Sequence, residues 1–125
     1  MQLKNVLVTG GAGFIGSHLV DRLLADGHTV TVLDNYSTGR AENLLQHSGN
    51  ENLKISEVDI SDYEAILPFF SDIDTVFHLA ALADIVPSIQ RPLEYHKANV
   101  DGTVSCLEAS RQCGVKKFIY AASSS

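Results

Sequence analysis

Three glycines near the N-terminus have the spacing of a phosphate-binding turn. Gly10, Gly13 and Gly16 read GxxGxxG and follow directly on a short β-branched, apolar run. Gly10 suits a tight turn from strand to helix, and Gly13 lets a diphosphate approach the main chain because it has no Cβ. Gly16 allows close helix packing, so that the first helical amides, near Phe14 and Ile15, face the anion. No Gly-Lys-Ser/Thr follows, which excludes a Walker loop.

A carboxylate ends the next apolar run. Asp34 could accept hydrogen bonds from both hydroxyls of an adenosine ribose and would repel a 2′-phosphate, which favours NAD over NADP. Arg40 keeps NADP open, because a nearby Arg can accommodate that phosphate. The polar residues that follow Asp34 are further cofactor-binding candidates or simple turn residues: Asn35, Ser37, Thr38 and Gly39.

Strand-like runs alternate with helical segments along the chain, and these elements must position the turn and the carboxylate. We predict strands at 6–9, 29–33, 53–58, 75–80 and 115–122, and helices at 14–25, 61–70 and 93–113, with a helical turn near 41–46. Ser61 is expected to cap the second helix in a capping box with Glu64. The alternation predicts one α/β domain over residues 1–125: a Rossmann-type, doubly wound parallel sheet in the order 3-2-1-4-5 with helices on both faces.

Composition argues against several partner classes. The chain has 125 residues, 45% of them apolar, and a net charge of −6 without a basic cluster, which argues against nucleic acid. Its apolar runs are far shorter than the roughly 20 residues of a membrane span, and the N-terminus lacks the features of a signal peptide. Cys106 and Cys113 lack CxxC spacing, so we expect reduced thiols, no metal site and a cytoplasmic location.

Six motifs in order along the chain resemble those of extended short-chain dehydrogenases/reductases, and most closely the nucleotide-sugar 4-epimerases. They are TGGAGFIG at 9–16, LDN at 33–35, DI at 59–60, HLAA at 78–81, NVDGT at 99–103 and FIYAASSS at 118–125. The resemblance covers essentially the whole chain. It implies NAD as the cofactor and a nucleotide sugar, of the UDP-sugar type, as the substrate.

The resemblance also implies roles for individual residues. Asp59 and the main chain of Ile60 would bind the adenine, with capping of the turn before the next helix as the alternative role of Asp59. Leu79, Ala80 and Ala81 would line the nicotinamide side of the groove, and Asn99 would steady the loop after the fourth strand. Ser123 would hydrogen-bond the reacting sugar hydroxyl, with Ser124 as the adjacent candidate. His78 is expected to pack or hydrogen-bond within its strand rather than to act in catalysis.

The family's activity implies epimerisation through transient oxidation at C4 by bound NAD, with 4,6-dehydration or decarboxylation as alternatives. The family's catalytic Tyr-x-x-x-Lys is absent, because the residues four places after Tyr36, Tyr63, Tyr95 and Tyr120 are Arg40, Leu67, Asn99 and Ser124. We therefore expect the N-terminal part of a longer, homodimeric enzyme, truncated after the fifth strand. By itself this part would be an NAD-binding module without turnover, which self-associates through the open edge of that strand.

Overall fold

A five-stranded parallel sheet forms the centre of the molecule, with strand order β3-β2-β1-β4-β5. The computed structural model describes residues 4–35, 40–80 and 89–120. The strands are β1 (Asn5–Thr9), β2 (Thr29–Asp34), β3 (Leu53–Glu57), β4 (Thr75–His78) and β5 (Lys117–Tyr120). The predicted strand order is confirmed, and within the described residues the strand bounds differ from the predicted ones by one or two residues. For example, β4 ends before Ala80, whose amide donates to the Thr9 side chain instead of continuing the ladder. The predicted end of the fifth strand, at 121–122, lies outside the described residues.

Helical segments connect the strands and have these bounds: α1 (Phe14–Ala25), the 3₁₀ helix η1 (Ala41–His47), α2 (Tyr63–Ile66), the 3₁₀ helix η2 (Leu67–Phe70), α4 (Pro92–His96), the π-helical turn η3 (Lys97–Asp101) and α5 (Gly102–Cys113). The first helix has the predicted bounds. The predicted Ser61 cap is wrong: Asp62 caps α2, and its carboxylate accepts from the Ala65 amide. Ser61 instead turns its hydroxyl toward Asp59.

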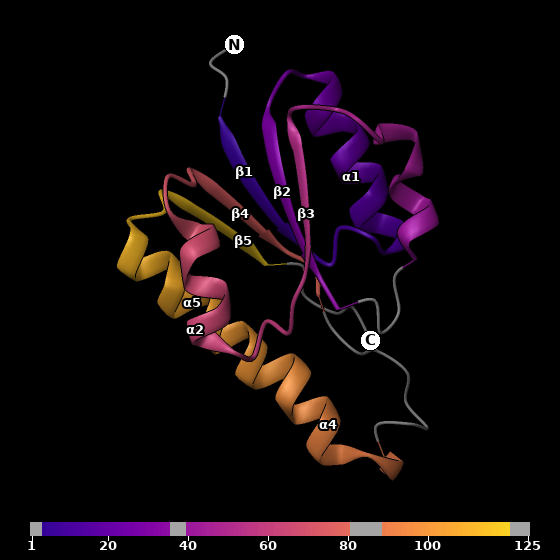
Figure 1. Cartoon of the computed structure of the whole chain (residues 1–125). Helices are drawn as coiled ribbons and strands as arrows, with labels where there is room; N and C mark the ends of the chain where they lie inside the picture. The colour runs from indigo at the N-terminus through magenta and orange to yellow at the C-terminus, as the bar shows by residue number, and fades with distance from the viewer. Residues whose placement is uncertain (1–3, 36–39, 81–88, 121–125) are drawn as a thin grey trace.

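Two apolar cores lie on opposite faces of the sheet, because both faces of a doubly wound sheet are covered by helices. Side chains alternate along β1, so that Val6 and Val8 face one core and Leu7 faces the other. Figure 1 shows α1 and η1 on one side of the sheet, and α2 and α5 on the other. In the described part of the chain, none of the helices has the length and apolar character needed to cross a membrane.

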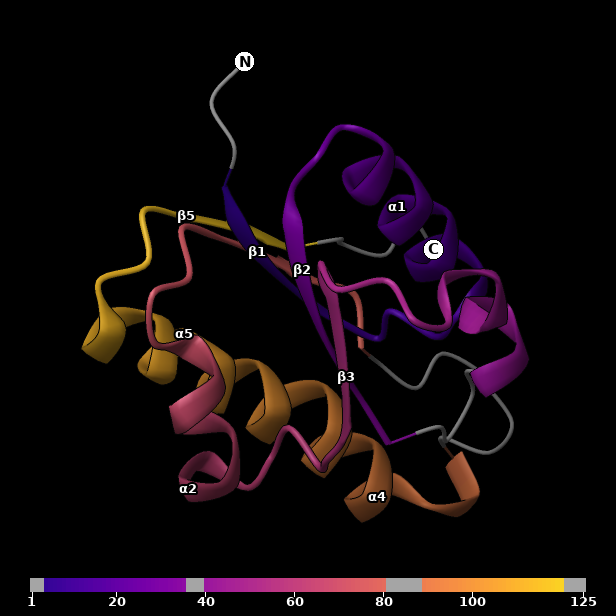
Figure 2. The same cartoon turned by 45° about the horizontal axis from the view of Figure 1, so that its top comes forward.

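One long helical rod carries the segment predicted as a single helix at 93–113. It is built from α4, η3 and α5 in direct succession. Figure 2 shows α4 extending the rod from the N-terminal end of α5. The rod packs closely on the sheet side at Gly102, where an added Cβ would lie 2.7 Å from Ile60 Cδ1. The π turn in its middle contains Asn99, and such turns are frequent at functional sites. Asn99 therefore lies in the π turn of this rod, and its role at the cofactor site stays a prediction.

Candidate functional site

The glycine turn connects β1 to α1 by very close main-chain packing. Gly10 has a φ of 73°, and its amide donates to Leu33 O at 2.9 Å. A Cβ on Gly10 would lie 2.8 Å from the Ala80 nitrogen, and one on Gly16 would lie 2.2 Å from Gly10 O. The first and third glycines are therefore required by the fold itself, independently of any ligand.

The first turn of α1 is open in the way an anion site needs. Gly13 precedes the helix in an extended conformation and makes no side-chain cap. Among the described residues, a Cβ there would meet only Gly10 O, at 3.3 Å. Phe14 and Ile15 are 78% and 71% exposed, so the start of the helix lies at the surface. Because the first amides of a helix have no partner within it, this terminus suits a diphosphate.

Asp34 lies beside this turn at the carboxyl end of β2. It is buried, and its Oδ2 accepts from the Ala12 amide at 3.0 Å. The ribose-binding candidate is thus fixed directly to the phosphate-binding candidate. Asn35, the next residue, is exposed. The predicted residues Ser37, Thr38 and Gly39 lie outside the described part of the chain.

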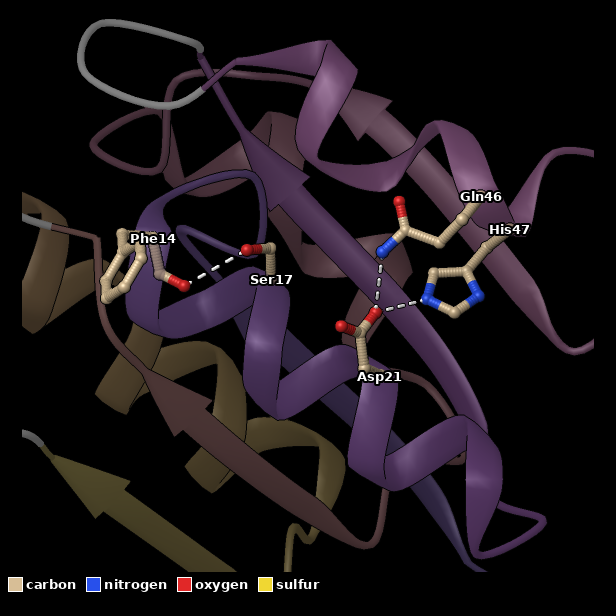
Figure 3. Close-up of polar contacts among 5 residues, drawn as sticks. All are labelled: Phe14, Ser17, Asp21, Gln46 and His47. Atoms are coloured by element: carbon tan, nitrogen blue, oxygen red, sulfur yellow. Dashed lines mark hydrogen bonds and ion pairs between the residues drawn. The ribbon is translucent and has the colours of Figure 1, made fainter.

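The 3₁₀ helix η1 closes the other side of the turn. Ala12 O accepts from the Asn43 side-chain amide at 2.7 Å and from the Arg40 main-chain amide at 3.0 Å. Asp21 on α1 holds η1 in place, accepting from Gln46 at 3.0 Å and pairing with His47 Nε2 at 2.5 Å. Figure 3 shows both contacts reaching one carboxylate oxygen, and also the Ser17 hydroxyl donating to the Phe14 carbonyl in the first turn of α1.

Asp59 and Ile60 follow β3, where the adenine-binding pair was predicted. Asp59 Oδ1 accepts from the amide and the hydroxyl of Ser61, and its Oδ2 lies 3.2 Å from Lys97 Nζ. Partial burial alone would raise the pKa of Asp59, but the hydrogen bonds from Ser61 and Lys97 outweigh it and lower that pKa. The Ile60 side chain is in the core beneath Gly102. Asp59 thus organises its turn, and its adenine contact stays a prediction.

His78 lies at the end of β4 in a directed chain of hydrogen bonds. The Thr103 hydroxyl donates to Asn99 O at 2.7 Å, so it accepts from His78 Nε2, which lies 2.9 Å away. This assigns the Nε2–H tautomer, and His78 Nδ1 therefore accepts from the Thr9 hydroxyl at 2.8 Å. Thr9 Oγ1 in turn accepts from the amides of Leu79 and Ala80.

Burial keeps this histidine neutral. It lowers the pKa of His78 to about 4, which fits a ring that donates through one nitrogen and accepts through the other. The ring of Tyr120 stacks on it, with centroids 5.7 Å apart. His78 therefore hydrogen-bonds to neighbouring elements, Thr9 on β1 and Thr103 on α5, and not, as predicted, within its own strand. Its chain of partners links Asn99 in the π turn to the main chain of Leu79 and Ala80.

The structure brings most of the described candidates to one edge of the sheet. The glycine turn follows β1, Asp34 ends β2, Asp59 follows β3 and Leu79 follows β4. In the strand order, β2 and β3 lie on one side of β1, and β4 and β5 lie on its other side. The order therefore reverses between β1 and β4, and ligands of such sheets bind at the carboxyl ends of the strands at this switch point. The open first turn of α1 and the buried carboxylate beside it fit a dinucleotide. Ala81, Ser123 and Ser124 lie outside the described residues.

Metal-binding groups are a separate question. Within residues 4–35, 40–80 and 89–120, no cluster of three or more His, Cys, Asp or Glu side chains is arranged to hold a metal ion.

The family is decided by comparison with known proteins. The model of the NAD dependent epimerase/dehydratase family matches residues 6–125. The chain belongs to this family. It is 45% identical, over 94% of its length, to UDP-glucose 4-epimerase of Mycolicibacterium smegmatis, covering 38% of that protein. It is 37% identical, over 93% of its length, to UDP-glucuronic acid decarboxylase 1 of Danio rerio, covering 27% of that protein.

A solved structure gives the same answer for the fold of this family member. UDP-N-acetylglucosamine 4-epimerase of Methanobrevibacter ruminantium, solved in complex with UDP-N-acetylmuramic acid, matches 99% of the chain with a TM-score of 0.91 and 44% identity. The match covers 39% of that protein. The chain thus spans about a quarter to two-fifths of the length of these relatives.

Several residues important to the site's geometry were missed by the sequence analysis. Gly11 is one, because a Cβ there would lie 2.7 Å from Val32 Cγ1. Asn43 and Thr103 are two more, since each contacts a residue far away in sequence: Asn43 contacts the Ala12 carbonyl, and Thr103 contacts the His78 ring. A signal existed for Thr103, which ends the NVDGT motif. Asn43 lies in an irregular polar stretch whose sequence predicts no contact with the glycine turn.

Proposed function

We propose that the protein carrying this chain is an NAD-dependent nucleotide-sugar epimerase of the UDP-sugar 4-epimerase type, and that this chain holds its cofactor. The observation that carries the proposal is the fixed pairing of Asp34 with the glycine turn, 3.0 Å from the Ala12 amide. One element would grip the ribose and the other the diphosphate, as dinucleotide sites require. The 45% identity to a UDP-glucose 4-epimerase supports the reaction type.

Each part of the site has a role in this proposal. Asp34 accepts from the adenosine ribose, and the amides near Phe14 and Ile15 face the diphosphate. Asp59 and Ile60 lie toward the adenine. The main chain of Leu79 and Ala80 lines the nicotinamide side, where the neutral His78 chain holds it in place.

The remaining roles are also proposals. Bound NAD supplies reversible oxidation at the sugar's reacting carbon. Ser123, or its neighbour Ser124, hydrogen-bonds the sugar hydroxyl. The chain by itself binds NAD without turnover, because it contains no Tyr-x-x-x-Lys. The parent enzyme is a homodimer acting in the cytoplasm.

Decarboxylation is the second candidate, favoured by the 37% identity to a UDP-glucuronic acid decarboxylase. One experiment separates the candidates. The full-length protein is incubated with UDP-glucose, UDP-N-acetylglucosamine and UDP-glucuronic acid, and the products are separated by chromatography and mass. Epimerisation gives a product of unchanged mass and new mobility, dehydration gives a loss of water, and decarboxylation gives CO₂ from the uronic acid alone. The absence of a 4-epimer with every substrate would refute the proposal.

A further inference from the structure

Ala12 stands between the glycines of the turn and is held from both sides. Its amide donates to Asp34 Oδ2 at 3.0 Å. Its carbonyl accepts from Asn43 Nδ2 at 2.7 Å and from the Arg40 amide at 3.0 Å. The Ala12 side chain is fully buried, so the residue has little freedom to move. Its carbonyl begins the peptide that ends at Gly13, the N-cap of α1.

The orientation of this carbonyl matters for an anion. A carbonyl oxygen carries partial negative charge, so a carbonyl turned toward a diphosphate would repel the diphosphate. Main-chain amides would attract it. Two donors hold the Ala12 oxygen on the side of η1. The Gly13 amide of the same peptide donates to Gly10 O at 3.1 Å. Both ends of the peptide that leads into α1 are therefore fixed before any ligand arrives.

Asn43 can hold this position because η1 is anchored independently of the turn. Leu44, the next residue, is buried in the core on the α1 side of the sheet. At the far end of η1, Gln46 and His47 contact Asp21 on α1 (Figure 3). The Asn43 amide is thus presented to Ala12 O by an element that packs on α1 itself.

We propose that Asn43 is a positioning residue of the dinucleotide site: its side-chain amide fixes the Ala12 carbonyl away from the diphosphate while Asp34 fixes the Ala12 amide. This inference rests on the proposed cofactor function. It makes η1 a third wall of the site, beside the glycine turn and the end of β2. The ordered turn then costs less free energy to form when the dinucleotide binds.

The test compares Asn43→Leu, which keeps the side-chain size and removes the donor, with Gln112→Met, the loss of a surface side-chain donor on α5 that contacts Glu108. Affinities of the cofactor-free, full-length proteins are measured by calorimetry with NAD, ADP-ribose and adenosine. We expect Asn43→Leu to weaken NAD and ADP-ribose by about three- to tenfold, the range for one lost hydrogen bond. Adenosine, which has no diphosphate, should bind both variants like the wild type, and Gln112→Met should bind NAD normally.

Asn43→Asp gives a second variant of the same size and polarity, should the Leu variant fail to fold. An ionised carboxylate cannot donate to Ala12 O, so NAD binding should weaken at least as much. Wild-type affinity for NAD in the Asn43 variants, or an equal loss for adenosine or in Gln112→Met, overturns the role of Asn43 and leaves the proposed function standing. Absence of NAD binding by the wild-type protein overturns both.

Discussion

Separate replacements of Gly16 and Gly13 by Ala should have different effects: the first should lower the stability of the fold, and the second should weaken cofactor binding. A Cβ on Gly16 would lie 2.2 Å from Gly10 O and 2.9 Å from Gly11 Cα. Ordinary contacts begin near 3.5 Å, so the helix or the turn would have to shift by about 1 Å. The obstructing atoms belong to the backbone and cannot rotate away. We expect Gly16→Ala to lower the free energy of unfolding by about 2–3 kcal/mol.

Gly13→Ala is the matched control, one helical turn earlier in the same segment. Gly13 has a φ of −74° and a ψ of 176°, which Ala adopts without strain. Within the described part of the chain, its Cβ would meet only Gly10 O, at 3.3 Å. Ala is a poorer N-cap residue than Gly, which lowers stability, but it also restricts the unfolded chain, which raises stability. These two effects nearly cancel, so the free energy of unfolding should change by less than about 1 kcal/mol. The methyl group would cover main chain offered to the diphosphate, and NAD affinity should fall about tenfold or more.

Urea denaturation of the cofactor-free, full-length protein measures the stabilities, and calorimetry with NAD measures the affinities. The expected pattern is a large loss of stability in Gly16→Ala and a selective loss of affinity in Gly13→Ala. Equal destabilisation by the two substitutions, or unchanged stability in Gly16→Ala, would refute the packing argument. Unchanged NAD affinity in a folded Gly13→Ala protein would refute the assignment of this surface to the diphosphate.

Three further predictions concern buried groups and the sheet edge. Because the pKa of His78 falls from 6.5 to about 4 on folding, its neutral form adds stability that is complete above about pH 6.5 and is lost as the pH falls toward 4. Urea denaturation of the wild type and of His78→Gln should show this loss. The difference between their urea midpoints should become smaller as the pH falls from 6.5 toward 4. Burial raises the pKa of the Cys106 thiol to about 12, so iodoacetamide should label Cys106 only when the protein unfolds. The half-buried Cys113 should react in the native protein. Labelling of Cys106 in the native protein would contradict its burial. Ile119 on the edge strand β5 is 38% exposed. Ile119→Lys should reduce the self-association of the isolated 125-residue chain, measured by sedimentation. A wild-type chain that is already monomeric would contradict this prediction.

The sequence by itself determined the fold class, because local patterns carry it. The three strands with buried residues, β1, β2 and β4, are short runs rich in β-branched residues. The helix α1 has the predicted bounds because its apolar spacing and the following Gly27 act within a few residues. The glycine turn and Asp34 were identifiable for the same reason. Their spacing along one βαβ unit fixes which end of the sheet they share.

Only the tertiary structure decided which groups hold the turn. Asn43 reaches Ala12 across 31 positions of sequence, and Thr9 reaches His78 across 69. No local pattern encodes such contacts, since they arise when neighbouring strands and the rod of α4, η3 and α5 pack together. The cap of α2 shows the same limit on a smaller scale. Ser61 and Asp62 are both good N-cap residues, and the Asp59 carboxylate, by engaging Ser61, leaves the cap to Asp62.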